Sequence, residues 1–478
     1  MSAFWVFAVF ALAAHADQPA YCDHPFDAVC NSQTKSKPTL AREDLHEKIA
    51  STLEAELKEG DLFGKISSNT TTALDQYHAA IQAGDPAAKS KAIALLRESM
   101  KSYSLVLNRA QDLILAEFKK LGISEDDLNR RLAMIRKDLA DEVGAIPSFQ
   151  GKVVGVGTTE IANTLQSAEI VSVRKFKVAA EQEHSFDFYR HCGIDGLESQ
   201  AYYIDSDHGF RICPGFLLLV LRSGSLDGLT FVASHELGHS IGVERSVLGA
   251  SNDSKKPPAM VERYRPFLKC VEKNFARDFA SIAEKGNYIL QKGLPALKAR
   301  LSELKKAKPL DMDEVIWAKR QIEMAEEKLD EMADTSQAVD RLFPPKASAV
   351  EQHALEICAD AVAYSELDRL FTQHPPADPW QVFAAQFRPL CEHDKELYIK
   401  LKYGPKLEDG MHPTTKYRIE AALRDPGIRK ALGCRPLDRP TDPPYCSLEG
   451  EVRPTTLPGA PSGVFTGKSQ PDNGSMAK

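Results

Sequence analysis

Two histidines four residues apart, His235 and His239, are the first residues whose types and spacing could support chemistry. On a helix they share one face, with Cβ atoms about 5–6 Å apart, and both imidazoles can bind one Zn²⁺ at about 2.0–2.1 Å. Glu236 lies at the edge of that face, where it can reach a zinc-bound water, the position of a general base. With 13 histidines in 478 residues, chance gives about 0.03 such motifs per chain. The pattern therefore predicts a zinc site rather than a coincidental pair of histidines.

A catalytic zinc takes three protein ligands and leaves one position open, so a third ligand must come from elsewhere. In the pattern HExxHxxGxxH, Gly242 matches the glycine, but the cation Arg245 occupies the third-ligand position and excludes that pattern. The better candidate is Glu356, whose helical stretch is otherwise apolar. Asp360 lies one turn further along the same face, where it can accept the second ring N–H of a zinc-bound histidine. His353, three residues before Glu356, is the rival ligand.

A later stretch, residues 410–419, contains a histidine and an arginine that could act together. His412 and Arg418 are six residues apart, and Pro413 between them favours a turn. Both side chains could point at an oxyanion formed on a substrate. An ordinary surface histidine at the start of a helix would have the same pattern.

Taken together, these motifs resemble the gluzincin metallopeptidases. The order HELGH, then ExxxD at Glu356 and Asp360, then His-Pro followed by Arg-Ile is similar to the group that holds the CAAX prenyl proteases, the HtpX-type heat-shock proteases and their soluble periplasmic relatives. The directly joined His412 and Pro413 favour that group. Residues 200–203 and 212–216 are similar to the strand motif of neprilysin, so the neprilysin group is the second choice.

The resemblance implies a zinc endopeptidase with one Zn²⁺ per chain and a protein or peptide substrate. His235, His239 and Glu356 would hold the metal, and Glu236 would act as the general base. His412 would stabilise the oxyanion and Arg418 would help to position it. A strand at 201–204 or 210–213 would be the cleft edge that pairs with an extended peptide.

Two other function classes are weighed against the peptidase. One is an exported zinc-binding scaffold or chaperone of the same fold without proteolytic turnover, which would have no need of Glu236. The other is a purely structural helical protein in which the motif is accidental. Metal content would separate the structural protein from the other two classes.

The elements that must position these side chains are mostly helical. Periodic apolar residues predict helices over 39–145, a buried helix over 226–241 and a helical run over 350–370. β-rich residues predict a pair of strands at 201–204 and 210–213. Residues 275–343 read as a helical hairpin. The fold class is therefore mainly α with a small β-sheet (α+β), and the resemblance implies a zincin-type domain.

Changes in composition predict the domain organisation. We expect a signal peptide at 1–16, a Cys-containing segment at 17–38 and a helical domain at 39–150. A metallopeptidase domain would follow at 151–433, with a helical insertion at about 260–345. The proline-rich tail, 434–478, is expected to be mostly disordered.

Composition and the first residues bear on location and partners. Charged residues make up 27% of the chain and the net charge is −7, so no overall basic field points to nucleic acid. The apolar run 3–14 is too short to span a bilayer comfortably, and Ala14-His15-Ala16 fits a cleavage site. We expect a secreted or periplasmic protein with no stable membrane span in the mature chain.

Nine cysteines support export, because an oxidising compartment allows disulfides. Proximity in the sequence suggests Cys22 with Cys30, Cys434 with Cys446, and Cys192 with Cys213, although spacing alone does not fix connectivity. An odd number leaves at least one thiol unpaired. We expect this to be Cys358, because a disulfide there would pull on Glu356.

Overall fold

A computed structural model describes the chain over most of its helical parts. The described residues are 18–31, 37–58, 62–145, 169–171, 192–193, 195–197, 201–204, 209–240, 259–306, seven positions between 322 and 336 (322, 325, 326, 329, 332, 333 and 336), 347–399, 412–439 and 442–452. Parts of the sequence interpretation lie outside them, among them the signal peptide at 1–16, and Gly242 with Arg245. Within the described residues the protein is mainly helical with small sheets, which confirms the coarse α+β class.

Four helices form the N-terminal part of the chain, as the sequence predicts. Asp85 caps the third with bonds from two backbone N–H groups, and Gly122, at φ 73°, ends it. The apolar stripe that includes Tyr103, Leu107 and Ile114 is fully buried, so it forms core. The helices are α1 (Lys37–Lys58), α2 (Leu62–Ala83), α3 (Pro86–Lys120) and α4 (Glu125–Ala145).

The main sheet has three short strands in the order β1-β3-β2. The predicted pair is confirmed: β2 (Ala201–Ile204) runs antiparallel to β3 (Gly209–Ile212). A third strand, β1 (Glu169–Val171), was not predicted and pairs parallel to β3. Three residues are too few to display the alternation that marks a strand.

The core of the molecule is a set of helices around α9 (Thr230–His239). The predicted buried helix at 226–241 begins as a 3₁₀ turn, Leu226–Leu229, before α9. The predicted run at 350–370 is divided at His353 into two helices. The other helices of this set are α8 (Leu218–Ser223), α15 (Ala349–Gln352), α16 (Ala354–Gln373), α17 (Pro379–Ile399), α18 (Thr415–Leu423) and α19 (Pro426–Ala431).

The segment between α9 and α16 returns to helix. Its helices are α11 (Ala259–Phe275), α12 (Ile282–Tyr288) and α13 (Leu294–Leu304). α11 belongs to the main core, whereas Ile282 and Met332 form a small core of their own. Lys298 lies 2.9 Å from Glu326, so α13 contacts the following arm of the predicted hairpin. Most of that arm is outside the described residues.

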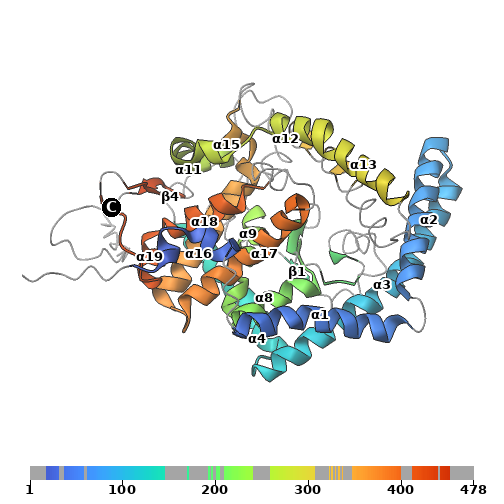
Figure 1. Cartoon of the computed structure of the whole chain (residues 1–478), viewed down its shortest axis with the longest axis horizontal. Coiled ribbons are helices and arrows are strands. Elements are labelled where there is room, and N and C mark those ends of the chain that lie inside the picture. Colours follow the sequence, from blue (N-terminus) through green and yellow to red (C-terminus); the bar gives the residue numbers. More distant parts are fainter. Residues whose placement is uncertain are drawn as a thin grey trace, which may run out of the picture.

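Figure 1 shows how these parts are arranged. Helices α1, α3 and α4 lie along one edge of the molecule, and α11, α12 and α13 lie along the opposite edge. Helices α9, α16, α17 and α18 lie between the two edges. Across the residues described, no helix is both long and apolar enough to cross a membrane.

Four disulfides staple the chain, and two of the expected pairings are wrong. Cys192 pairs with Cys213 as expected, and Cys358 is the buried free thiol. The pairings of Cys22 with Cys30 and of Cys434 with Cys446 are wrong, because the N-terminal cysteines each bond to a residue of the C-terminal third of the chain, and Cys446 bonds to α11. The observed bonds are Cys22–Cys434, Cys30–Cys391 and Cys270–Cys446.

The C-terminal segment is partly ordered, contrary to the expectation for 434–478. Strands β4 (Tyr445–Ser447) and β5 (Gly450–Val452) form a hairpin on α11. Gly450 has φ 109°, and a Cβ there would lie 3.3 Å from Pro266. The disulfide from Cys270 to Cys446 explains the order, because it ties the hairpin to a core helix. The chain beyond 452 lies outside the described residues.

Candidate metal centre

Helix α9 brings the two histidines of the HExxH motif to one buried face. His235 and His239 are four residues apart, and their side chains are 5% and 9% exposed. Their Nε2 atoms lie 3.2 Å apart, and the ring planes are nearly perpendicular. Two imidazole nitrogens therefore converge on one point in space.

Helix α16 packs closely on α9 and supplies two carboxylates. Gly238 makes this approach possible, because a Cβ there would lie 3.1 Å from the backbone Cα of Ala359. Glu356 Oε2 lies 3.2 Å from His235 Nε2, and Glu356 Oε1 lies 3.9 Å from His239 Nε2. The close packing thus places the predicted third ligand beside both histidines.

Asp360 contacts His235 at Nδ1, the ring nitrogen that does not face His239. Its Oδ1 lies 2.8 Å from His235 Nδ1, and the carboxylate is completely buried. Burial lowers the pKa of His235, but the hydrogen bonds to Asp360 and Glu356 outweigh burial and raise that pKa to about 9. A metal that binds Nε2 must therefore displace a proton, so its affinity depends on pH.

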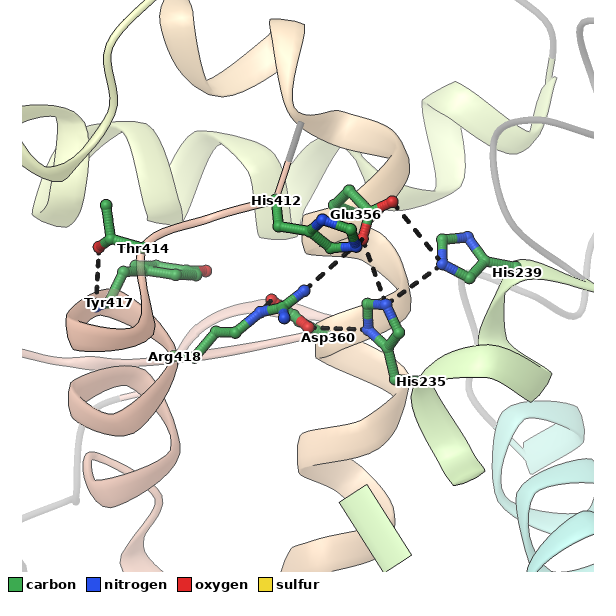
Figure 2. Close-up of polar contacts among 8 residues, drawn as sticks. All are labelled: His235, His239, Glu356, Asp360, His412, Thr414, Tyr417 and Arg418. Atoms are coloured by element: carbon green, nitrogen blue, oxygen red, sulfur yellow. Dashed lines mark hydrogen bonds and ion pairs between the residues drawn. The ribbon is translucent and has the colours of Figure 1, made fainter. Parts of the chain in front are cut away.

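The cluster is completed by His412, in the segment before α18, and by Arg418, in α18 (Figure 2). His412 Nε2 lies 3.0 Å from Glu356 Oε2. Arg418 is buried and donates from Nε to Asp360 Oδ2 at 2.9 Å, and its Nη2 lies 3.6 Å from Glu356 Oε2. Thr414 caps α18 by accepting from the backbone N–H of Tyr417. This bond fixes the turn that lies between His412 and Arg418.

The neighbouring histidine rings influence the charge state of Glu356. Burial alone raises the pKa of this carboxyl, but His412 and His239 outweigh burial and hold the pKa well below its usual range. Glu356 is therefore an anion at neutral pH. An anionic carboxylate and neutral imidazole nitrogens are the donors that Zn²⁺ prefers in proteins.

Glu236 lies in the same site but outside the contact network. The carboxylate is 9% exposed and makes no hydrogen bond or ion pair with any other residue that the structure describes. Burial is the largest influence on its pKa and raises it. A buried carboxyl with a raised pKa suits proton transfer near neutral pH.

Two of the three separations among the proposed ligands fit a four-coordinate ion. Donor atoms around a tetrahedral Zn²⁺ at about 2.0–2.1 Å are roughly 3.3 Å apart. The separations from His235 to His239 and from His235 to Glu356 are both 3.2 Å, close to that value. The separation from His239 Nε2 to Glu356 Oε1 is longer, at 3.9 Å. Among the described residues, the group whose donor atoms all lie within 4.8 Å of one another consists of His235, Glu356 and His412, without His239.

The rival ligand His353 is placed differently. Its Nδ1 lies 2.7 Å from the carbonyl oxygen of Ala349, and its ring packs against Phe279. The structure therefore brings together His235, His239, Glu356, Asp360, His412 and Arg418, with Glu236 beside them.

One residue that contacts the site helix was missed in the sequence. Gln386 of α17 is fully buried and accepts from the backbone N–H of Phe231 in α9. The available signal was a single amide within the apolar stretch 382–387. Buried polar side chains of this kind are normally hydrogen-bonded.

Searches with this chain find no matching family model, curated protein or solved structure. The function of the site is therefore argued from its own geometry.

Proposed function

We propose that this protein is an exported zinc-dependent endopeptidase of the gluzincin type. One observation carries the proposal: His235, His239 and Glu356 come from two packed helices to within ligand distance of one another. Asp360 lies behind His235, where a carboxylate orients a metal-binding imidazole. The intact Glu236 next to the first histidine supplies the group that hydrolysis requires.

Each residue has a distinct part in the proposed reaction. His235, His239 and Glu356 would hold the ion. Bound zinc supplies a Lewis acid that polarises the scissile carbonyl and lowers the pKa of a water towards about 7. Glu236 would take the proton of the attacking water and pass it to the leaving amine. Asp360 keeps His235 Nδ1 engaged, so that Nε2 presents its lone pair to the metal.

Arg418 has a different place from the one expected. The sequence interpretation assigns it to the substrate oxyanion, but its guanidinium bonds to Asp360 and approaches Glu356. We assign it to the ordering of these two carboxylates, whose negative charge its single positive charge partly offsets. The oxyanion role then rests on His412 alone.

The position of His412 also favours a second candidate function. His412 lies within the same group of potential ligands as His235 and Glu356. A zinc with four protein ligands and no open position is a structural centre. If His412 binds the ion, the protein would be the zinc-binding scaffold or chaperone of the sequence interpretation.

The sheet suggests where a peptide would bind. β3 is bonded on both sides, so it offers no free edge to a substrate. β2 lies at the end of the described sheet and packs against α9. We therefore favour β2 over β3 as the strand that an extended protein or peptide substrate joins by β-addition.

Export is the last element of the proposal. Four disulfides fit a protein that matures in an oxidising compartment. With the expected signal peptide at 1–16, this supports secretion or a periplasmic location.

The decisive experiment couples metal content to cleavage. The mature protein is purified, its metals are counted by mass spectrometry of the elements, and a peptide library is digested with and without a chelator. We expect one zinc per chain and cleavage that the chelator abolishes and added zinc restores. Zinc without cleavage would favour the scaffold, and absence of both would exclude the metal site.

A further inference from the structure

α9 begins directly after the 3₁₀ turn Leu226–Leu229. Ser225 caps that turn by accepting from the backbone N–H of Asp227, and the carbonyl oxygen of Asp227 accepts from the backbone N–H of Thr230, the first residue of α9. The N-terminal N–H groups of a helix need acceptors. The next N–H group of α9, that of Phe231, finds its acceptor on another element.

Gln386, on α17, supplies that acceptor. Its Oε1 accepts from the backbone N–H of Phe231 at 2.9 Å, and its Nε2 donates to the backbone carbonyl of Asp227 at 2.7 Å. One amide thus joins the 3₁₀ turn to α9. The direction of the amide is fixed, because the reverse orientation would place a donor against a donor and an acceptor against an acceptor.

The contact continues from Phe231 to the metal-binding ring. Phe231 is one helix turn before His235, and its ring packs on Phe387 of α17 at 4.7 Å between centroids. The same ring lies beside the imidazole of His235, at 6.2 Å and nearly parallel. A shift of Phe231 would therefore move His235 directly.

Helix α17 is itself fixed in place. The disulfide from Cys30 to Cys391 ties it to the N-terminal segment. Tyr21 of that segment stacks on Trp380 in the first turn of α17, with the ring centroids 4.1 Å apart. Gln386 lies between these two attachments, so it acts from a rigid support.

We propose that Gln386 is a positioning residue that sets the place of α9, and through Phe231 the place of His235, in the metal centre. This inference rests on the proposed zinc site. It predicts that loss of the amide costs metal affinity and turnover beyond the general cost of losing one buried amide.

The test compares two glutamines of similar burial. Gln386→Met keeps the size of the side chain and removes both hydrogen bonds, whereas Gln111→Met makes the same change in α3. We expect Gln386→Met to bind zinc about tenfold more weakly and to lower kcat with KM unchanged, in line with other residues that orient ligands. Gln386→Glu keeps an acceptor for Phe231 and should fall between wild type and Gln386→Met.

Three results decide the proposal. Equal zinc affinity in Gln386→Met and Gln111→Met, at equal loss of melting temperature, would overturn it. If the wild type binds no zinc, the proposed function fails, and hydrogen exchange of the peptide 230–239 then tests the positioning alone. Faster exchange in Gln386→Met than in Gln111→Met supports the role of Gln386, and equal exchange overturns it.

Discussion

Arg418 donates from Nε to Asp360 Oδ2 at 2.9 Å, while the other oxygen of Asp360 lies 2.8 Å from His235 Nδ1. The aspartate is completely buried, and a buried anion is tolerated only when it is paired and hydrogen-bonded. Arg418 therefore stabilises the carboxylate that orients the first proposed metal ligand.

The first prediction concerns Asp360. Asp360→Asn keeps the shape of the side chain but removes the charge that favours one tautomer of His235. We expect zinc affinity to fall by about 10–100-fold, as for other groups that orient a metal-binding histidine. Competition with a fluorescent chelator measures this change. Glu366→Gln, a buried carboxyl change further along α16, is the matched control and should leave affinity unchanged.

The second prediction separates the base from the ligands. Glu236 makes no ion pair with the residues described around it, so Glu236→Gln should retain near-stoichiometric zinc. Hydrolysis should fall by about 10²–10⁴-fold, the usual contribution of a general base. Elemental analysis and a peptide assay on the same sample check both parts. A variant that cleaves at the wild-type rate would contradict the proposed mechanism.

The third prediction tests the choice of third ligand. Glu356→Ala leaves an incomplete two-histidine site and should lose zinc, whereas His353→Ala should retain it. His353 is a suitable control because it is buried in the same helical run but turned towards the α15 backbone. Zinc retained in Glu356→Ala and lost in His353→Ala would reverse the assignment.

Local patterns made much of this site predictable. His235 with His239, and Glu356 with Asp360, each repeat at four residues on one helix, so the helical period alone places each pair on one face. The apolar stripes of α1 and α3 are predictable for the same reason. No such rule places α16 against α9, and the resemblance to a known group supplied that step.

The parts that were missed depend on contacts between distant segments. The Cys22–Cys434 bond joins residues 412 positions apart, and no spacing rule identifies such partners. The hairpin β4–β5 is ordered because it packs on α11. Its proline-rich sequence predicts disorder because sequence composition does not report this contact. The contact between Arg418 and Asp360 depends on the fold, and no sequence pattern indicates it. For this reason Arg418 was assigned to an oxyanion instead.

The fourth prediction concerns pH and a carboxyl pair away from the metal. Asp425 caps α19, is buried, and shares a hydrogen bond with Asp368 of α16. Burial first, and then Asp368, raise the pKa of Asp425 well above its ordinary value. Burial also raises the pKa of Asp368, and the hydrogen bond to Asp425 partly opposes it.

A raised carboxyl pKa means that the folded protein binds the proton more tightly than the unfolded chain does. This stabilisation is complete below the unfolded pKa and is lost as pH rises through the folded pKa. Asp368→Asn should therefore flatten the decline in unfolding free energy that begins as pH rises above the ordinary aspartate pKa of about 4. Urea unfolding measures it. Asp85→Asn, at the exposed cap of α3, is the control and should keep the wild-type slope.

The last prediction decides whether His412 stabilises a transition state or binds the metal. An oxyanion donor acts when negative charge develops as water attacks, so it affects the transition state more than the bound substrate. In that case His412→Ala should lower kcat by about 10²–10³-fold, or about 2.7–4 kcal/mol. KM and zinc content should change little.

The geometry also supports a role for His412 as a metal ligand, because His412 Nε2 lies only 3.0 Å from the proposed ligand Glu356. If His412 is a ligand, His412→Ala should weaken zinc binding and open a coordination position. Hydrolysis could then rise from a low wild-type rate, since a catalytic zinc needs that position. His374→Ala, a change of an exposed histidine at the end of α16, is the control. Zinc content and kcat, measured together, assign His412 to one role, and wild-type values of both would remove it from the site.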